Sequence, residues 1–281
     1  MNVLKFGGSS VATSKNIQKV LAIVSKSSEE QDVVVVVSAF GKTTNALIKG
    51  ATLAAQKNED YLEVLKELEN NHFNIIKELL PVKEQSSVNG YVKQLFNHLE
   101  TIYEGCFLLR ELSPKTLAKV SSFGELLSSY IISKAANENF KAVYKDTREL
   151  IVASDNYNNA LVDFSATFKN CQDYFSGHKQ RVTIVPGFVA RTINGKTTTL
   201  GRGGSDFTAA IISAALDCSE LQIWTDVSGM FTANPSIVKQ ASVIDHISYH
   251  EAMELSHFGA KVIYPPTIQP VLQKEIPIVI K

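Results

Sequence analysis

The order of apolar and polar positions predicts that strands and helices alternate at both ends of the chain. Residues 3–6 predict a short strand, and apolar residues at 17, 20, 21 and 24 then follow the spacing of one helix face, with Ser14 as the expected cap. Val33–Val37 is an unbroken β-branched run, which is typical of a strand buried on both faces of a parallel sheet. Strand, glycine turn, helix and strand together predict a right-handed βαβ unit.

A period of 3.6 residues predicts a helical block between about residues 45 and 136. The helical segments are expected at 61–68, 75–80, 92–109 and 114–136, and Pro81 is expected to end the second. Strands are then expected at 142–144, 182–185, 197–200, 221–224 and 276–280, with helices at 207–216 and 249–258. The sequence therefore predicts an α/β fold in which a helical block caps one end of a mostly parallel sheet.

The composition is that of a soluble globular protein. Of 281 residues, 44% are hydrophobic and 20% are charged, and 28 Lys+Arg balance 28 Asp+Glu, so no net charge attracts nucleic acid or a membrane. Three cysteines without CxxC spacing argue against a disulfide framework and a zinc ribbon. The chain opens without a secretory signal, and its longest apolar run is too short to cross a bilayer. We expect a cytoplasmic protein with no nucleic-acid or membrane partner.

Two glycine-rich turns, each between a strand and a helix, are the first candidates for chemistry. In KFGGSS (residues 5–10) the glycines allow backbone N–H groups to face an anion, and Lys5 adds a charge that can reach a phosphate. In LGRGGSD (200–206), Arg202 adds a planar fork that suits a carboxylate or phosphate. The spacing is neither that of a Rossmann loop nor that of a Walker loop. One turn is expected to bind nucleotide phosphates and the other the acceptor.

The residues of both turns can also be explained by structural roles alone, without a ligand. Lys5 can be a solvated lysine after a tight βα turn, and Ser205 or Asp206 can be an ordinary helix N-cap. Glu125 lies in an apolar helical stretch, and we expect it to be exposed because an unpaired glutamate is rarely buried. His246 and His250 lack an HExxH context, so a zinc site is not expected.

Three further segments carry weaker signals. SAFGKTTN (38–45) follows the valine strand and places hydroxyl groups at the sheet edge where open α/β folds bind ligands. Residues 224–235 fit either a loop around a nucleotide or a hairpin-like connection. Residues 258–265 place Lys261 just after a predicted helix, where it could act on a ligand. Alternatively, this segment is an ordinary helix C-cap in which the lysine interacts favourably with the helix dipole.

Taken together and in chain order, these segments resemble the aspartate kinases of the amino acid kinase family. The resemblance rests on KFGGSS, the SA…TN loop, FGE at 123–125, PGF at 186–188, GRGGSD at 201–206, WTDV at 224–227 and FGAKV at 258–262. Each segment is short, but the combination is specific and spans nearly the whole chain. Residues 249–265 are similar to the kinase part of bifunctional aspartate kinase–homoserine dehydrogenases, in which regulatory ACT modules and a dehydrogenase follow. We expect those further domains to be absent from this chain.

The resemblance implies a three-layer α/β/α sandwich with a mostly parallel central sheet and a helical insertion. Residues 1–281 would form one catalytic domain, with an aspartate-binding lobe to about residue 195 and a nucleotide-binding lobe from about residue 196. The implied reaction is ATP-dependent phosphorylation of the L-aspartate side chain to 4-phospho-L-aspartate, the first step toward lysine, threonine and methionine. ATP with Mg²⁺ would be the cofactor, no protein-bound metal is expected, and the full-length enzyme would be a homo-oligomer. Another small carboxylate, phosphate or carbamate as acceptor, and a non-catalytic ligand-binding relative, are the alternatives.

The resemblance also assigns residues. Lys5 and Lys261 would stabilise the transferring phosphoryl group and Asp206 would hold these lysines. The residues implied for the nucleotide are Gly7, Gly8, Ser9, Thr225, Asp226, Phe231, Ser236 and Val262. Those implied for aspartate are Ser38, Thr44, Glu125, Phe188, Arg202 and Ser205, with Arg202 on the α-carboxylate and Glu125 on the ammonium. Phe231, Asn234, Ser236 and Tyr264 depart from the family pattern, which motivates the non-catalytic alternative.

Overall fold

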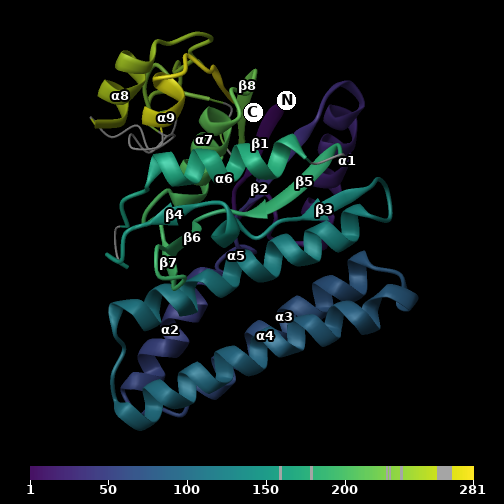
Figure 1. The fold of residues 1–281 in the computed structure, drawn as a ribbon, viewed down its shortest axis with the longest axis vertical. Helices are drawn as coiled ribbons and strands as arrows, with labels where there is room; N and C mark the ends of the chain where they lie inside the picture. Colours follow the sequence, from purple (N-terminus) through teal and green to yellow (C-terminus); the bar gives the residue numbers. More distant parts are fainter. Residues whose placement is uncertain (158–159, 178–179, 226, 228, 235–236, 258–267) are drawn as a thin grey trace.

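A computed structural model of the chain describes residues 1–157, 160–177, 180–225, 227, 229–234, 237–257 and 268–281. A six-stranded sheet in the order β3-β5-β2-β1-β8-β9 forms its centre, and every neighbouring pair in this sheet is parallel. These strands are β1 (Asn2–Phe6), β2 (Val33–Val37), β3 (Ala142–Tyr144), β5 (Val182–Pro186), β8 (Glu220–Trp224) and β9 (Ile278–Ile280). Helices cover both faces of the sheet, as Figure 1 shows. The predicted three-layer sandwich is confirmed.

The valine strand explains why the sheet needs a helical layer on each side. Alternate side chains of a strand point to opposite faces. Val33, Val35 and Val37 pack into the core that includes α1 (Ser14–Glu30). Val34 and Val36 enter the other core, which includes α7 (Gly204–Ala215). Burial of β2 on both faces, predicted from the unbroken valine run, is therefore confirmed.

The helical block extends from one end of the sandwich (Figure 1). It consists of α2 (Thr43–Ala55), α3 (Tyr61–Leu79), α4 (Val82–Leu109) and α5 (Pro114–Ala136). Its buried side chains share one hydrophobic core with α1 and one face of the sheet. Pro81 follows the end of α3, as predicted, and its φ of −64° also suits the residue that precedes α4. The predicted helical insertion is confirmed, although α4 begins ten residues earlier than expected.

A second, smaller sheet lies beside the central one. It consists of β4 (Val152–Ala153), β6 (Val189–Thr192) and β7 (Thr197–Thr199), with β6 and β7 paired as an antiparallel hairpin. The strand expected at 197–200 belongs to this sheet. The pattern of apolar residues did not predict β4, β6 or α6 (Phe164–Ser176), which follow the short 3₁₀ turn η1 (Thr147–Glu149).

Two helix starts differ from the prediction. Thr13, not Ser14, caps α1, because the Thr13 hydroxyl accepts the Asn16 N–H at 3.2 Å and Ser14 is already the first helical residue. Helix α7 begins at Gly204, three residues before the predicted start, after the left-handed Gly203. Ser205 and Asp206 therefore lie in the first turn of α7, and their interpretation as N-caps is wrong.

The last part of the described chain adds two short helices to the sandwich. They are α8 (Tyr249–His257) and α9 (Gln269–Leu272), and β9 completes the central sheet after them. The helix predicted at 249–258 is observed as α8, except that residue 258 lies outside the described residues. None of the described helices combines the length and apolarity needed to cross a membrane.

The contact between α2 and α4 yields a test of how tightly the helical block is packed. A Cβ added at Gly50 of α2 would lie 2.8 Å from the Tyr103 ring, and the Tyr103 hydroxyl already donates to the Leu47 carbonyl at 2.7 Å. We expect Gly50→Ala to lower the free energy of unfolding by about 1–3 kcal/mol, because a fully buried ring must move.

The matched control for this test is Gly90→Ala in α4. Nothing lies within 4 Å of a Cβ added at Gly90, so alanine there should be neutral or stabilising by up to about 1 kcal/mol. Urea unfolding of both variants measures the difference. Equal stabilities would show that α2 and α4 have room to separate.

Candidate active site

Lys5 and Asp206 form an ion pair between the central sheet and α7. The Lys5 side chain points from β1 toward the face that α7 covers, and its Nζ lies 2.6 Å from the Asp206 Oδ1. Both side chains are largely buried, with 11% and 19% of their surface exposed. Because Asp206 lies in the first turn of α7, the carboxylate also benefits from the positive end of the helix dipole. The pair therefore fixes a lysine ammonium at the carboxyl edge of the sheet.

Gly8 brings the turn after β1 into contact with the loop after β2. A Cβ at Gly8 would lie 3.0 Å from the Gly41 carbonyl oxygen and 3.1 Å from that of Ala39. The Gly41 N–H in turn donates to the Gly8 carbonyl at 3.0 Å. Glycine is thus favoured at position 8 because the turn after β1 and the loop after β2 approach each other too closely for a side chain.

Two more glycines bring the remaining loops together. A Cβ at Gly187 would lie 2.5 Å from the Ser205 Cβ, and one at Gly204 would lie 2.6 Å from the Phe188 ring. Phe188 itself has a φ of 67°, an unusual value for a bulky residue, and its N–H donates to the Thr208 hydroxyl at 2.9 Å. The two glycines therefore let residues 187–188 pack closely against the start of α7, and the left-handed backbone of Phe188 adds some conformational cost.

Glu125 is buried in α5, with only 5% of the residue exposed, so the expectation of an exposed glutamate is wrong. Removal from water raises the pKa of Glu125 from its ordinary value of 4.5 to about 8, although a hydrogen bond from the Ala39 N–H opposes the shift. Its Oε2 has no hydrogen-bond partner among the described residues. A pKa of about 8 favours the neutral form of Glu125 at neutral pH, and no ion pair forms with it among the described residues.

These loops and helices enclose one cavity of about 260 Å³. The residues that line it are Lys5, Ser38, Thr44, Glu125, Phe188, Gly201, Gly203, Gly204, Ser205 and Asp206. Every residue implied for aspartate except Arg202 is among them, together with the predicted pair of Lys5 and Asp206. The cavity places a buried carboxyl group and an ammonium–carboxylate pair around a space of small-molecule size.

Arg202 is the exception among the residues implied for aspartate. Its side chain is exposed and does not line the cavity, although its neighbours Gly201 and Gly203 do. Both of these glycines have the positive φ of a left-handed backbone, 74° and 68°. The role of Arg202 in binding a carboxylate stays a prediction.

Within the described part of the chain, the residues predicted for the nucleotide are not gathered in one cavity. Ser9 and Thr225 line a separate hollow of about 410 Å³, together with Phe6 and Trp224, which stack on each other. Phe231 lines neither this hollow nor the cavity. Asp226, Ser236, Lys261 and Val262 lie outside the described residues. The nucleotide site therefore stays a prediction.

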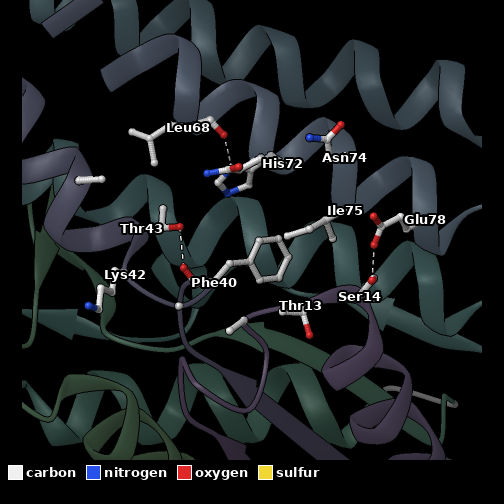
Figure 2. A pocket seen from close by; sticks show the side chains of 14 residues that line it. Thr13, Ser14, Phe40, Lys42, Thr43, Leu68, His72, Asn74, Ile75 and Glu78 are labelled. Atoms are coloured by element: carbon white, nitrogen blue, oxygen red, sulfur yellow. Dashed lines mark hydrogen bonds between the residues drawn. The ribbon is translucent and has the colours of Figure 1, made fainter. Parts of the chain in front are cut away.

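A second cavity lies on the other side of the loop after β2, and a buried residue of α3 beside it packs against the loop. It measures about 420 Å³ and lies between α3 and the loop, as Figure 2 shows. His72 of α3 is fully buried, its Nδ1 hydrogen-bonds the Leu68 carbonyl at 2.7 Å, and its ring lies 5.3 Å from the Phe40 ring. Burial lowers the pKa of His72 to about 4, so the ring is neutral at physiological pH. Neutral aromatic packing thus fixes Phe40 and the loop that carries it.

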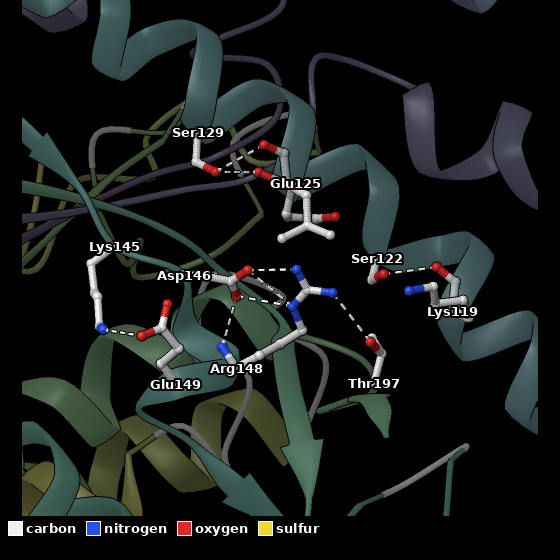
Figure 3. Close-up of polar contacts among 10 residues, drawn as sticks. Lys119, Ser122, Glu125, Ser129, Lys145, Asp146, Arg148, Glu149 and Thr197 are labelled. Carbon is white, nitrogen blue, oxygen red and sulfur yellow. Dashed lines mark hydrogen bonds and ion pairs between the residues drawn. The ribbon is translucent and has the colours of Figure 1, made fainter. Parts of the chain in front are cut away.

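A polar network lies beside α5 outside the cavity (Figure 3). The Arg148 guanidinium binds both carboxylate oxygens of Asp146 and donates to the Thr197 hydroxyl at 3.3 Å. This network links η1 to β7 and does not line the cavity. No group of three or more acidic, histidine or cysteine side chains suited to a metal occurs in the part of the chain that the structure describes.

The burial of Glu125 has a consequence for stability that can be measured. Between pH 4.5 and about 8 the folded state binds a proton that the unfolded state has lost, so the free energy of unfolding falls as pH rises through this window. Glu125→Gln removes the titration. The free energy of unfolding of the variant, relative to the wild type, should therefore rise by about 4 kcal/mol between about pH 5 and pH 9, as measured by urea unfolding.

The control is Glu67→Gln, which changes an exposed glutamate of α3. Its stability should follow the wild type at every pH. If Glu125→Gln also runs parallel to the wild type, Glu125 is ionised in the folded protein and the interpretation of the cavity must change.

Comparison with known proteins adds an independent finding. The model of the amino acid kinase family matches residues 1–281. The chain is 36% identical to the bifunctional aspartokinase/homoserine dehydrogenase of Buchnera aphidicola, over 100% of this chain and 35% of that protein. It is also 36% identical to aspartokinase 1, chloroplastic, of Arabidopsis thaliana, over 99% of this chain and 49% of that protein.

Solved structures give the same result. E. coli aspartokinase III in complex with aspartate and ADP, in the R-state, has a TM-score of 0.90 and 31% identity, over 100% of this chain and 61% of that one. The T-state of that protein, in complex with lysine and aspartate, has a TM-score of 0.88. The chain thus spans between about a third and three fifths of the length of these relatives.

Proposed function

The chain belongs to the amino acid kinase family, and on that premise we propose that it phosphorylates the side-chain carboxylate of L-aspartate with ATP. A bond forms between a carboxylate oxygen of aspartate and the γ-phosphorus of ATP, and the bond from that phosphorus to the β–γ bridging oxygen breaks. The products are 4-phospho-L-aspartate and ADP. The cavity that joins Glu125 to the Lys5–Asp206 pair is the observation that carries this proposal.

Glu125 would select an amino acid with a free ammonium. A buried carboxyl group becomes ionised when a cation binds beside it, because the cation replaces the lost hydration. The hydroxyl groups of Ser38, Thr44 and Ser205 line the same cavity and can donate to the two carboxylates of aspartate. Among the relatives, E. coli aspartokinase III is described in complex with aspartate, which supports this substrate over other small carboxylates.

Lys5 would lower the repulsion between the two reacting anions. The acceptor is already a carboxylate, so the reaction needs no general base. It needs fixed positive charge where the phosphoryl group passes from one oxygen to another. Asp206 holds the Lys5 ammonium at this place, and the N-terminus of α7 adds the partial positive charge of its N–H groups. The second lysine of the proposal, Lys261, is assigned from the resemblance alone.

ATP would bind with its phosphates over the turn after β1, with the residues predicted for the nucleotide around it. Mg²⁺ prefers octahedral oxygen ligands and is commonly bound through substrate phosphates, so it would enter the site together with ATP. The boundary near residue 195 between the aspartate and nucleotide lobes, a cytoplasmic location and a homo-oligomeric full-length enzyme remain parts of this proposal.

The first test compares L-aspartate with N-acetylaspartate, which has both carboxylates and no ammonium. We expect kcat/KM for the acetylated compound to be lower by about 10³-fold, because it leaves a buried polar group unpaired. ADP release, measured with a coupled assay, gives both values. Glutamate serves as the control for length, since it keeps the ammonium. Equal or faster turnover of N-acetylaspartate or glutamate would contradict the proposed substrate.

The second test concerns the charge at the centre of the cavity. Lys5→Ala should lower kcat about 100-fold, or about 3 kcal/mol, with little change in the KM for aspartate. Asp206→Asn should lower kcat less, since the lysine remains but is less firmly held. Lys15→Ala, which removes an exposed lysine of α1, is the control and should keep full activity. A Lys5→Ala enzyme with normal kcat would exclude Lys5 from the reaction.

A further inference from the structure

Helix α5 contains five serines that are buried to at least 95%. Four of them donate to a carbonyl three or four residues earlier in the same helix, which is the usual arrangement for serine within a helix. These bonds join Ser121 to Leu117, Ser122 to Lys119, Ser129 to Glu125 and Ser133 to Tyr130. Figure 3 shows those of Ser122 and Ser129.

Ser128 is the exception in this set. Its hydroxyl lies 2.8 Å from the Ser38 carbonyl, ninety residues away in the sequence, and 3.2 Å from the Glu125 carbonyl of its own helix. Ser129 already donates to that Glu125 carbonyl at 2.5 Å. A hydroxyl has one proton, so the shorter bond, which leaves the helix, is the stronger of the two.

Ser38 is the first residue of the loop between β2 and α2, which lies between the turn proposed for the ATP phosphates and the cavity proposed for aspartate. Its N–H donates to the Phe6 carbonyl at 3.1 Å, and the Gly41 N–H donates to the Gly8 carbonyl at 3.0 Å. The loop is therefore fastened on one side to the turn proposed for the phosphates. Its other side faces α5, where Ser38 and Glu125 line the proposed aspartate cavity.

Ser128 and Glu125 contact neighbouring residues of this loop. Ser128 donates to the Ser38 carbonyl, and the Ala39 N–H donates to the Glu125 carboxylate. The helix and the loop are tightly packed here, since a Cβ added at Gly124 would lie 2.7 Å from the Ala39 Cβ. When a ligand ammonium binds Glu125, the carboxylate has to accept hydrogen bonds from both the ligand and the Ala39 N–H. The Ser128 bond does not involve the ligand and is unaffected.

We propose that Ser128 is a positioning residue, whose hydroxyl holds the loop of residues 38–41 against α5 and so sets the width of the aspartate cavity. This inference rests on the proposed function of that cavity. Without the Ser128 hydroxyl the Ser38 carbonyl loses its donor from α5, and the loop can move away from Glu125. Aspartate then has to bring the loop back when it binds, which weakens binding more than it slows the chemical step.

The test compares Ser128→Ala with Ser122→Ala. Both serines are fully buried on α5, but the hydroxyl of Ser122 donates to a carbonyl of its own helix and, among the described residues, to no other element. We expect Ser128→Ala to raise the KM for aspartate about tenfold with kcat within about twofold. Ser122→Ala should leave both constants near the wild type. Ser128→Cys, which keeps a weak donor, should fall between alanine and serine.

Hydrogen exchange separates this proposal from the proposed function. Amides of residues 39–41 should exchange faster in Ser128→Ala than in the wild type, and at the wild-type rate in Ser122→Ala. If the wild type does not phosphorylate aspartate, the proposed function fails, and this exchange result still decides whether Ser128 holds the loop. Equal exchange in the two variants, or equal KM values in an active enzyme, would overturn the role of Ser128.

Discussion

A buried carboxyl group that has no ion-pair partner among the described residues is the constraint on which the proposed site depends. Glu125 lies in a helix packed against the sheet, and within the described part of the chain its backbone donor from another element is the Ala39 N–H. Burial favours the neutral form of such a group, and an ammonium bound beside it favours the ionised form. The cavity is therefore suited to a zwitterionic amino acid, and a purely anionic ligand gains nothing from Glu125.

The same cavity is also lined by the ion pair of Lys5 and Asp206. Lys5 and Asp206 neutralise each other, which lets both remain largely buried. An incoming phosphate or carboxylate can share the Lys5 ammonium without moving it far. Selectivity would thus come from Glu125 and charge stabilisation from Lys5, and the first residues of α7 line the same cavity.

The sequence predicted most of the fold, because its main elements have strong local signals. The valine run of β2 and the apolar stripes of α3 and α5 are examples. Strands of two to four residues, such as β4 and β6, have too few positions to show a period, and their pairing depends on contacts with distant residues. The start of α7 was missed because Gly203 and Gly204 are read as loop residues, while close approach to Phe188 requires glycine at 204.

The candidate site was predictable only as a set of residues. The glycine motifs and the resemblance together name nearly every residue of the cavity, but no sequence pattern shows that Glu125 is buried. That burial follows from Gly124, which allows the helix to approach Ala39, and from loops that meet only in the folded chain. Ser128 carries no sequence signal either, since five serines in α5 look alike until their partners are known.

The most direct measurement of the central claim is the number of protons released when aspartate binds. Isothermal titration near pH 7 in buffers of different ionisation enthalpy gives that number. Ionisation of a carboxyl group whose pKa is about 8 predicts release of close to one proton per aspartate bound, and none for N-acetylaspartate. Binding of aspartate without proton release would show that Glu125 is already ionised or does not meet the ammonium, and would contradict the claim.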